Sequence, residues 1–318
     1  MNFIFNPKAI IGIIISLCGL YWAFIDFQFQ DFIQSLLEIN YMYILLATVF
    51  LWGSVALRAL RWRYLFTTEE APKTISLYQA ELIGYFGNNV LPLRFGEFLR
   101  AIIIGNKYQL SKTYVFGTIV LERLLDTILL LLLSILLIFI YPMDDFLKNN
   151  IVRGSLWMCL GLVFLFMIVY VIKNLQSKHR FIKSINEIIN SLLSIKKKSI
   201  FPIFILSVLI WAIYLLDVYF LECAFELNLS FSQIIMILVL SSIALSIPSA
   251  PGMIGTYHAA VKYTIVDLFG FTPCIGNAFA IIMHAYSYIL LTVLGSYYFF
   301  KDHFSDHVLQ DITNLEKE

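Results

Sequence analysis

Long apolar runs make up most of this chain of 318 residues and restrict the folds that it can adopt. Six runs are long enough to cross a bilayer core of about 30 Å as helices, because each helical residue adds about 1.5 Å. They lie near residues 9–25, 41–57, 113–141, 151–172, 200–223 and 274–300. With 60% hydrophobic residues, the chain is predicted to be an all-α integral membrane protein, with residues 1–318 forming a single membrane domain.

Two further apolar regions are interrupted by a break. Residues 74–105 hold about fourteen residues of apolar helix, a polar break at residues 88–97, and only about ten more apolar residues. Residues 231–271 hold two moderate arms around a break at residues 248–252. Irregular backbone inside a membrane is tolerated only against protein or a watery cavity. Both regions are therefore predicted to be re-entrant helical hairpins, and two tight crossings remain an alternative for residues 231–271.

The placement of Lys and Arg predicts the orientation. Basic residues gather in the segments that would share one side, while acidic residues dominate the opposite loops. The basic residues are Lys8, Arg58, Arg61, Arg63, Lys73, Lys107, Lys112, the lysines and arginine between residues 173 and 198, and Lys301. On this pattern Arg58 and Arg61 are expected in a cytoplasmic loop. A multi-pass protein of the cytoplasmic (inner) membrane with both termini cytoplasmic is expected.

The order of these segments repeats along the chain. Residues 1–141 and residues 150–300 each contain two spans, a hairpin and a further span, and the second half begins on the opposite face. This predicts an inverted-topology repeat of six full spans plus two re-entrant hairpins, equivalent to eight spans, with a site near the midplane where the breaks correspond. Residues 174–199 are expected to form a cytoplasmic amphipathic connector, and residues 301–318 a cytoplasmic tail.

The first break carries the residue types that bind an anion. Arg94, Glu97 and Arg100 follow one another at three-residue spacing, so they share a helix face if the return helix starts near Arg94. A helix N-terminus with free N–H groups beside Arg94 suits a phosphate, and Asn89 lies at the same break. Glu97 is expected to meet an ammonium group or a proton. The alternative is that these charges only neutralise one another and hold the hairpin in place.

A second charged set, Glu122, Arg123 and Asp126, lies within an apolar run. Glu122 and Asp126 are four residues apart and repel one another on a helix face unless a cation sits between them. Arg94 or Arg100 from the first hairpin is the expected cation.

The second break is less charged. Gly252 and the Gly255-Thr256 pair open a second return helix, on which His258 and Lys262 share a face. His258 is either a proton relay or a packed, hydrogen-bonded histidine. No metal-ligand spacing or cofactor motif is found, so neither a metal nor a cofactor is expected.

These motifs together resemble the membrane domain of the lysylphosphatidylglycerol synthases and their stand-alone, flippase-like relatives. The residues that carry the resemblance are Asn89, Pro92, Arg94, Gly96, Glu97 and Arg100, then Glu122, Arg123 and Asp126, then Pro251, Gly252, Gly255 and Thr256. The resemblance covers nearly the whole chain. The soluble aminoacyl-transferase domain of the fuller family members has no counterpart here, so the resemblance implies lipid movement and not aminoacyl transfer.

One position departs from the family pattern. Relatives often have Phe and Glu after the second motif, where this chain has Tyr257 and His258. The difference argues against any function that needs an acid at His258, and it points to a different lipid or mode of coupling.

The sequence thus favours a non-enzymatic flippase for a phospholipid or another lipid-phosphate substrate, with Arg94 and Arg100 on the phosphate and the acids balancing charge or binding an amine. A coupling ion or proton and a homo-oligomer are compatible partners, and no nucleic acid is expected. Two alternatives stay open: a non-catalytic scaffold for lipid-modifying enzymes, and a membrane enzyme acting on lipid-linked substrates.

Overall fold

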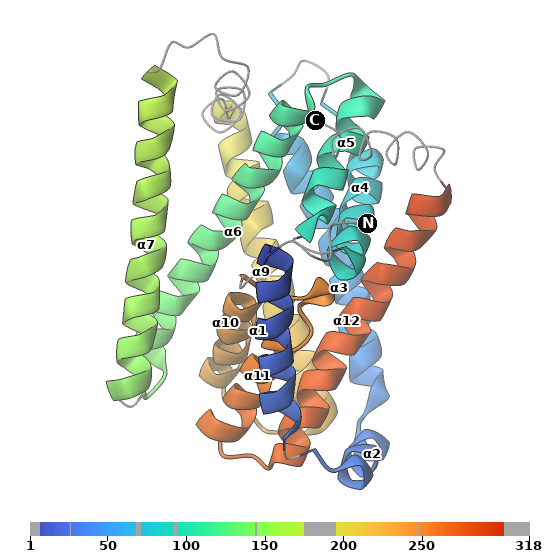
Figure 1. Cartoon of the computed structure of the whole chain (residues 1–318), viewed down its shortest axis with the longest axis vertical. Helices are drawn as coiled ribbons and strands as arrows, with labels where there is room; N and C mark the ends of the chain where they lie inside the picture. Colours follow the sequence, from blue (N-terminus) through green and yellow to red (C-terminus); the bar gives the residue numbers. More distant parts are fainter. Residues whose placement is uncertain are drawn as a thin grey trace. The chain divides into compact units, whose positions relative to one another are not determined.

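The computed structural model describes residues 7–25, 27–67, 71–91, 94–143, 145–174, 195–246 and 249–301, and within them all regular structure is helical (Figure 1). The helices are α1 (Pro7–Phe24), α2 (Phe29–Glu38), α3 (Tyr41–Tyr64), α4 (Thr74–Val90), α5 (Gly96–Tyr108), α6 (Lys112–Ile140), α7 (Asp145–Asn174), α9 (Lys197–Phe225), α10 (Phe231–Ser246), η2 (Pro251–Met253), α11 (Thr256–Lys262), the π-helix η3 (Tyr263–Leu268) and α12 (Pro273–Lys301).

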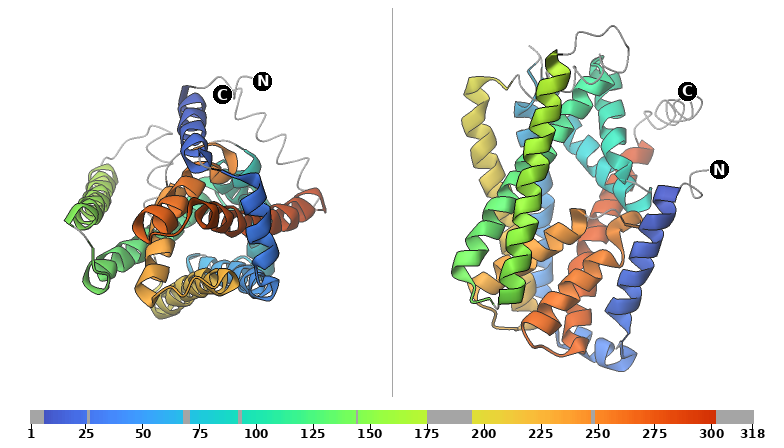
Figure 2. Two further views of the ribbon diagram at one scale, coloured as in Figure 1. Left: turned by 90° about the horizontal axis from the view of Figure 1, so that it is seen from below. Right: turned by 60° about the vertical axis from the view of Figure 1, so that its left-hand side comes forward.

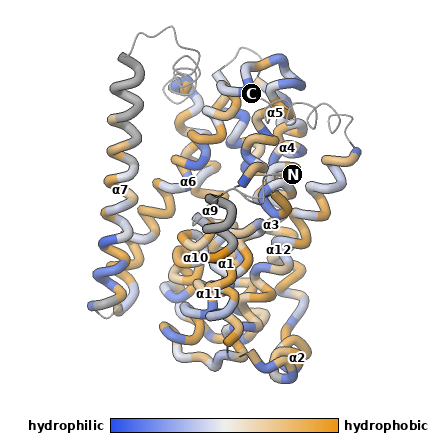
Figure 3. Tube along the Cα trace, in the orientation of Figure 1, coloured by the Kyte–Doolittle hydropathy of each residue, from blue (hydrophilic) through white to orange (hydrophobic). Residues whose placement is uncertain are grey.

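Four of these helices, α3, α6, α9 and α12, are long and apolar enough to cross a membrane. Figure 3 shows them as mostly hydrophobic. Large apolar side chains such as Phe139 on α6 and Phe300 on α12 are exposed, as expected for surfaces that face lipid and not water. The chain is therefore an integral membrane protein, as predicted. The other two predicted spans coincide with α1, of 18 residues, and α7, of 30 residues. The predicted connector and tail lie largely outside the described residues.

The chain forms two compact units. The first unit comprises residues 1–55, 82–96 and 212–298. The second unit comprises residues 56–81, 97–211 and 299–318. Within the first unit, α11 packs against both α1 and α10, and within the second unit α6 packs against α7 (Figures 1 and 2). Each unit draws on segments that are far apart in the sequence.

The first break separates two antiparallel helices, α4 and α5. In the second unit the Lys73 N–H donates to the Tyr108 hydroxyl at 2.9 Å, so the outer ends of the two arms meet. In the first unit Gly96 lies so close to the Gly84 carbonyl that any Cβ would overlap it. The break is shorter than the predicted residues 88–97, because α4 continues to Val90. The helix ends there because Pro92 disfavours helical backbone at the residue before it, Leu91. Within the break, Arg94 has a positive φ of 55°.

The second break lies wholly in the first unit, between α10 and α11. Its turn requires the left-handed region, with φ of 69° at Gly252 and 101° at Gly255. The Ala250 N–H donates to the Ser16 hydroxyl at 2.7 Å, and Gly255 packs directly on the Ser16 carbonyl, so α1 supports the turn. The returning arm is the seven-residue α11 continued by the six residues of η3.

Candidate functional site: a buried charge cluster

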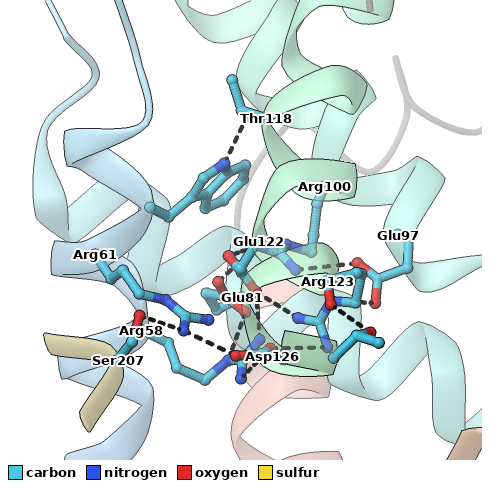
Figure 4. Close-up of polar contacts among 12 residues, drawn as sticks. Arg58, Arg61, Glu81, Glu97, Arg100, Thr118, Glu122, Arg123, Asp126 and Ser207 are labelled. Atoms are coloured by element: carbon cyan, nitrogen blue, oxygen red, sulfur yellow. Dashed lines mark hydrogen bonds and ion pairs between the residues drawn. The ribbon is translucent and has the colours of Figure 1, made fainter. Parts of the chain in front are cut away.

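Eight ionisable side chains from four helices form one charge cluster in the second unit (Figure 4). Its members are Arg58 and Arg61 on α3, Glu81 on α4, Glu97 and Arg100 on α5, and Glu122, Arg123 and Asp126 on α6. Four arginines face four acids, so the formal charges cancel when all are ionised. The acids on α6 begin ten residues after Lys112, about 15 Å along that helix, which places the cluster well inside a membrane-crossing segment.

Glu122 is the centre of the charge cluster. Its side chain is fully buried, and it pairs with the guanidinium groups of Arg58, Arg100 and Arg123. The Arg100 contact is 3.0 Å between Nη2 and Oε2. A buried carboxylate of this kind is stable only because several cations and hydrogen bonds replace the water that it has lost.

The cation between Glu122 and Asp126 is chiefly Arg58, which the sequence interpretation had assigned to a loop. One Arg58 nitrogen pairs with Glu122, and Nη1 lies 3.3 Å from Asp126 Oδ2. Arg61, one turn later, lies 2.8 Å from Asp126 Oδ1. The loop assignment was wrong because α3 continues to Tyr64, and Arg58 and Arg61 are both buried on one of its faces. Their three-residue spacing directly after an apolar run is a signal for a shared helix face, but it does not identify the acids that this face contacts.

Arg100 attaches the first hairpin to this cluster. Its Nη2 lies 2.5 Å from Glu81 and 3.0 Å from Glu122, and its Nη1 lies 3.0 Å from Glu97. The guanidinium also stacks 4.2 Å above the ring of Trp62, whose indole N–H donates to Thr118 at 2.8 Å. Arg100 thus contacts Glu122, as predicted for a cation from the hairpin, but the arginines that pair with Asp126 come from α3 and α6. Glu81 is a cluster member that the predicted site did not include.

One side of the charge cluster is accessible. The side chains of Arg58, Arg61, Glu81, Arg100 and Glu122 are at most 3% exposed. By contrast, the side chains of Arg123, Glu97 and Asp126 are 39%, 17% and 16% exposed. We call these three residues the cluster edge. One cation and two acids are therefore available to a molecule that approaches it.

The remaining predicted site residues lie in the first unit, where the two breaks come side by side. The Tyr288 hydroxyl on α12 donates to the Asn89 carbonyl at 3.3 Å, and the Asn89 amide donates to Thr292 at 2.8 Å. A Cβ at Gly252 would clash with the Tyr288 ring and lie 3.5 Å from the Asn89 carbonyl. Arg94 lies at the same break as Asn89 and in the same unit.

The second return helix carries polar groups that contact aromatic rings and backbone carbonyls. His258 is buried, and its ring centroid lies 4.8 Å from that of His284. Lys262 is also buried, donates to the Trp22 carbonyl at 3.3 Å, and lies 5.4 Å from the Trp22 ring. Thr256 donates to the Met253 carbonyl at 3.3 Å. Among the described residues, no group of three or more His, Cys, Asp or Glu could hold a metal ion.

Comparison with known proteins agrees with the motifs. The sequence profile of the family described as the lysylphosphatidylglycerol synthase TM region matches residues 9–295. A UPF0104 membrane protein of Methanocaldococcus jannaschii is 25% identical, over 91% of this chain and 93% of that protein. A UPF0104 membrane protein of Methanothermobacter thermautotrophicus is 22% identical, over 82% and 86% of the two chains. No solved structure matches the chain at a significant level. The resemblance seen in the motifs is thereby confirmed, and the chain belongs to the family of the lysylphosphatidylglycerol synthase TM region.

Proposed function

We propose that the protein is a non-enzymatic transporter that moves a phosphate-bearing lipid across the cytoplasmic membrane. The observation that carries this proposal is the cluster edge. Charged side chains inside a membrane are costly and are usually retained where a polar guest passes. Here the five inner charges are buried in ion pairs, some of them with the edge, while the three edge residues remain accessible. Membership of a family named for a lipid synthase's membrane region also supports a lipid substrate.

The chemistry of the edge suggests a role for each group. The Arg123 guanidinium offers a planar donor array that matches phosphate oxygens. Glu97 and Asp126 would balance that charge or accept hydrogen bonds from an amine on the head group. Arg100 is buried as well as engaged with acids at both terminal nitrogens, so we assign it to positioning Glu97 and Glu122. Arg94 remains a candidate phosphate contact at the break.

The same proposal includes the inverted repeat. The arms of the first hairpin have 17 and 13 residues, and those of the second have 16 residues and, with α11 and η3 taken together, 13 residues. The first hairpin follows the longer helices α1 and α3 and precedes α6. The second follows the longer helices α7 and α9 and precedes α12. We infer two re-entrant hairpins and six spans, with both termini cytoplasmic and one repeat rocking against the other to give alternating access.

The test is lipid translocation in proteoliposomes. Purified protein is reconstituted with phosphatidylglycerol that carries a fluorescent acyl chain, and dithionite quenches the lipids that reach the outer leaflet. Arg123→Gln should slow translocation at least ~10-fold, the effect of losing one charge-assisted hydrogen bond. The matched control is Arg63→Gln, since Arg63 is exposed on α3. Equal rates for Arg123→Gln and the control, in folded protein, would remove Arg123 from the site.

A further inference from the structure

Asp217 is a buried acid that belongs to no ion pair among the described residues. It lies on α9 in the first unit and is 8% exposed. Its Oδ2 accepts a hydrogen bond from the Tyr286 hydroxyl on α12. Its Oδ1 is buried and has no hydrogen-bond partner within the described part of the chain. A buried carboxylate with an oxygen in this state is unfavourable because its charge is poorly compensated, and binding a proton removes that charge.

Another acid on the same helix shows how unusual this arrangement is. Glu222 is equally buried, but its Oε1 accepts from the Leu229 N–H at 3.1 Å and its Oε2 from the Cys223 thiol at 3.4 Å. Both of its oxygens are therefore occupied near the end of α9. Tyr286, the partner of Asp217, lies thirteen residues into the 29-residue α12, about 20 Å along it. Asp217 thus faces the middle of a membrane-crossing helix.

Polar groups connect Asp217 to the second break. The titratable groups that face it are Tyr286 on α12 and Tyr257 on α11, and Tyr257 is hydrogen-bonded to Ser241 on α10. The Tyr257 ring lies 5.0 Å from that of His284, which is hydrogen-bonded to the Gly252 backbone. The His258 ring also lies against that of His284, with the centroids 4.8 Å apart. Asp217 is therefore only a few side-chain contacts away from the turn of the second hairpin, close enough for a change of its charge to affect that turn.

We propose that Asp217 is a proton-binding site that couples transport to a proton gradient. One proton from water binds the Asp217 carboxylate and gives the neutral acid, and its release restores the carboxylate, so the site changes by one charge unit per cycle. Tyr286 positions the carboxyl group and keeps its hydroxyl proton throughout. The coupling half of this proposal rests on the proposed transport function, whereas the proton-binding half does not.

Carbodiimide labelling tests proton binding without any transport. Dicyclohexylcarbodiimide reacts with protonated carboxyls in apolar surroundings, and mass spectrometry locates the adduct on wild-type protein in liposomes across a pH series. The expected result is an adduct at Asp217 that forms at acidic pH and declines as the pH rises, with its midpoint moved in Tyr286→Phe. Glu222, on the same helix, should remain unlabelled. No adduct at Asp217 at any pH, or labelling independent of pH, would overturn the proton site.

The coupling is tested by translocation of the fluorescent phosphatidylglycerol with and without an imposed pH gradient. In the wild type and in Glu222→Gln the gradient should accelerate translocation several-fold, while in Asp217→Asn the ratio of the two rates should fall to one. A wild-type rate indifferent to pH, or one raised only by a sodium gradient, would contradict proton coupling. No translocation under any condition would instead contradict the proposed function, while the labelling result would still decide the proton site.

Discussion

The two hairpins have arms of similar length and opposite chemistry. The first hairpin is joined to its neighbours by ion pairs, with Arg100 and Glu97 entering a charge cluster of eight members. The second hairpin is joined to its neighbours by close packing at Gly255, by ring contacts around His258 and by the hydrogen bond from Lys262 to the Trp22 carbonyl. Two hairpins of similar size therefore have different properties: the first presents fixed charges, and the second places protonatable groups beside a tight turn.

This contrast predicts different sensitivities. A buried ion pair adds little net stability compared with apolar packing of the same volume. Removing one of its partners, however, leaves a buried charge without compensation and lowers stability. A turn built on glycines is instead sensitive to volume and to backbone conformation. Substitutions that change charge should therefore affect the first hairpin most, and substitutions that add atoms should affect the second.

The largest effect is expected at the centre of the charge cluster. Glu122→Gln leaves three arginines around a neutral amide, and we expect a loss of about 3–5 kcal/mol in stability. The measurement is thermal unfolding of the purified protein in detergent. Glu226→Gln, at an exposed acid, is the matched control and should change little. Equal melting temperatures for the two variants would show that the charge cluster does not hold the first hairpin.

A smaller effect is expected at the turn of the second hairpin. Gly255→Ala forces a side chain into a φ of 101° and against the Ser16 carbonyl, which should cost about 1–3 kcal/mol. Gly53→Ala is the control, because nothing lies within 4 Å of an added Cβ there. That control should be neutral or stabilise α3 by about 0.5–1 kcal/mol. A Gly255→Ala protein that unfolds at the wild-type temperature would contradict the close packing of α1 on the turn.

Much of the fold follows from local patterns. Run length and hydropathy predicted the six long helices but not the short α2. Pro92 and Pro251 marked the two breaks, because proline restricts the residue before it and lacks an N–H group. The three-residue spacing of Glu97 and Arg100 correctly predicted that they share a face. Their ion pair with each other corresponds to the alternative reading, in which the charges neutralise one another.

Long-range partners could not be predicted in this way. Arg58 belongs to the charge cluster through Glu122, 64 residues away, and Asp217 depends on Tyr286, 69 residues away. In a single sequence, an arginine at the end of an apolar run has the same appearance whether it faces water or a buried acid. Only the packing of α3 against α6 distinguishes the two.

The most direct test of the central claim is to find where a lipid head group binds. A phosphatidylglycerol analogue with a photoreactive head group is cross-linked to the reconstituted protein, and the adducts are mapped by mass spectrometry. We expect adducts on α5 and α6 beside Glu97 and Arg123, reduced several-fold in Arg123→Gln and unchanged in Arg63→Gln. Adducts confined to outward-facing apolar surfaces, with the same yield in both variants, would contradict a phosphate site at the cluster edge.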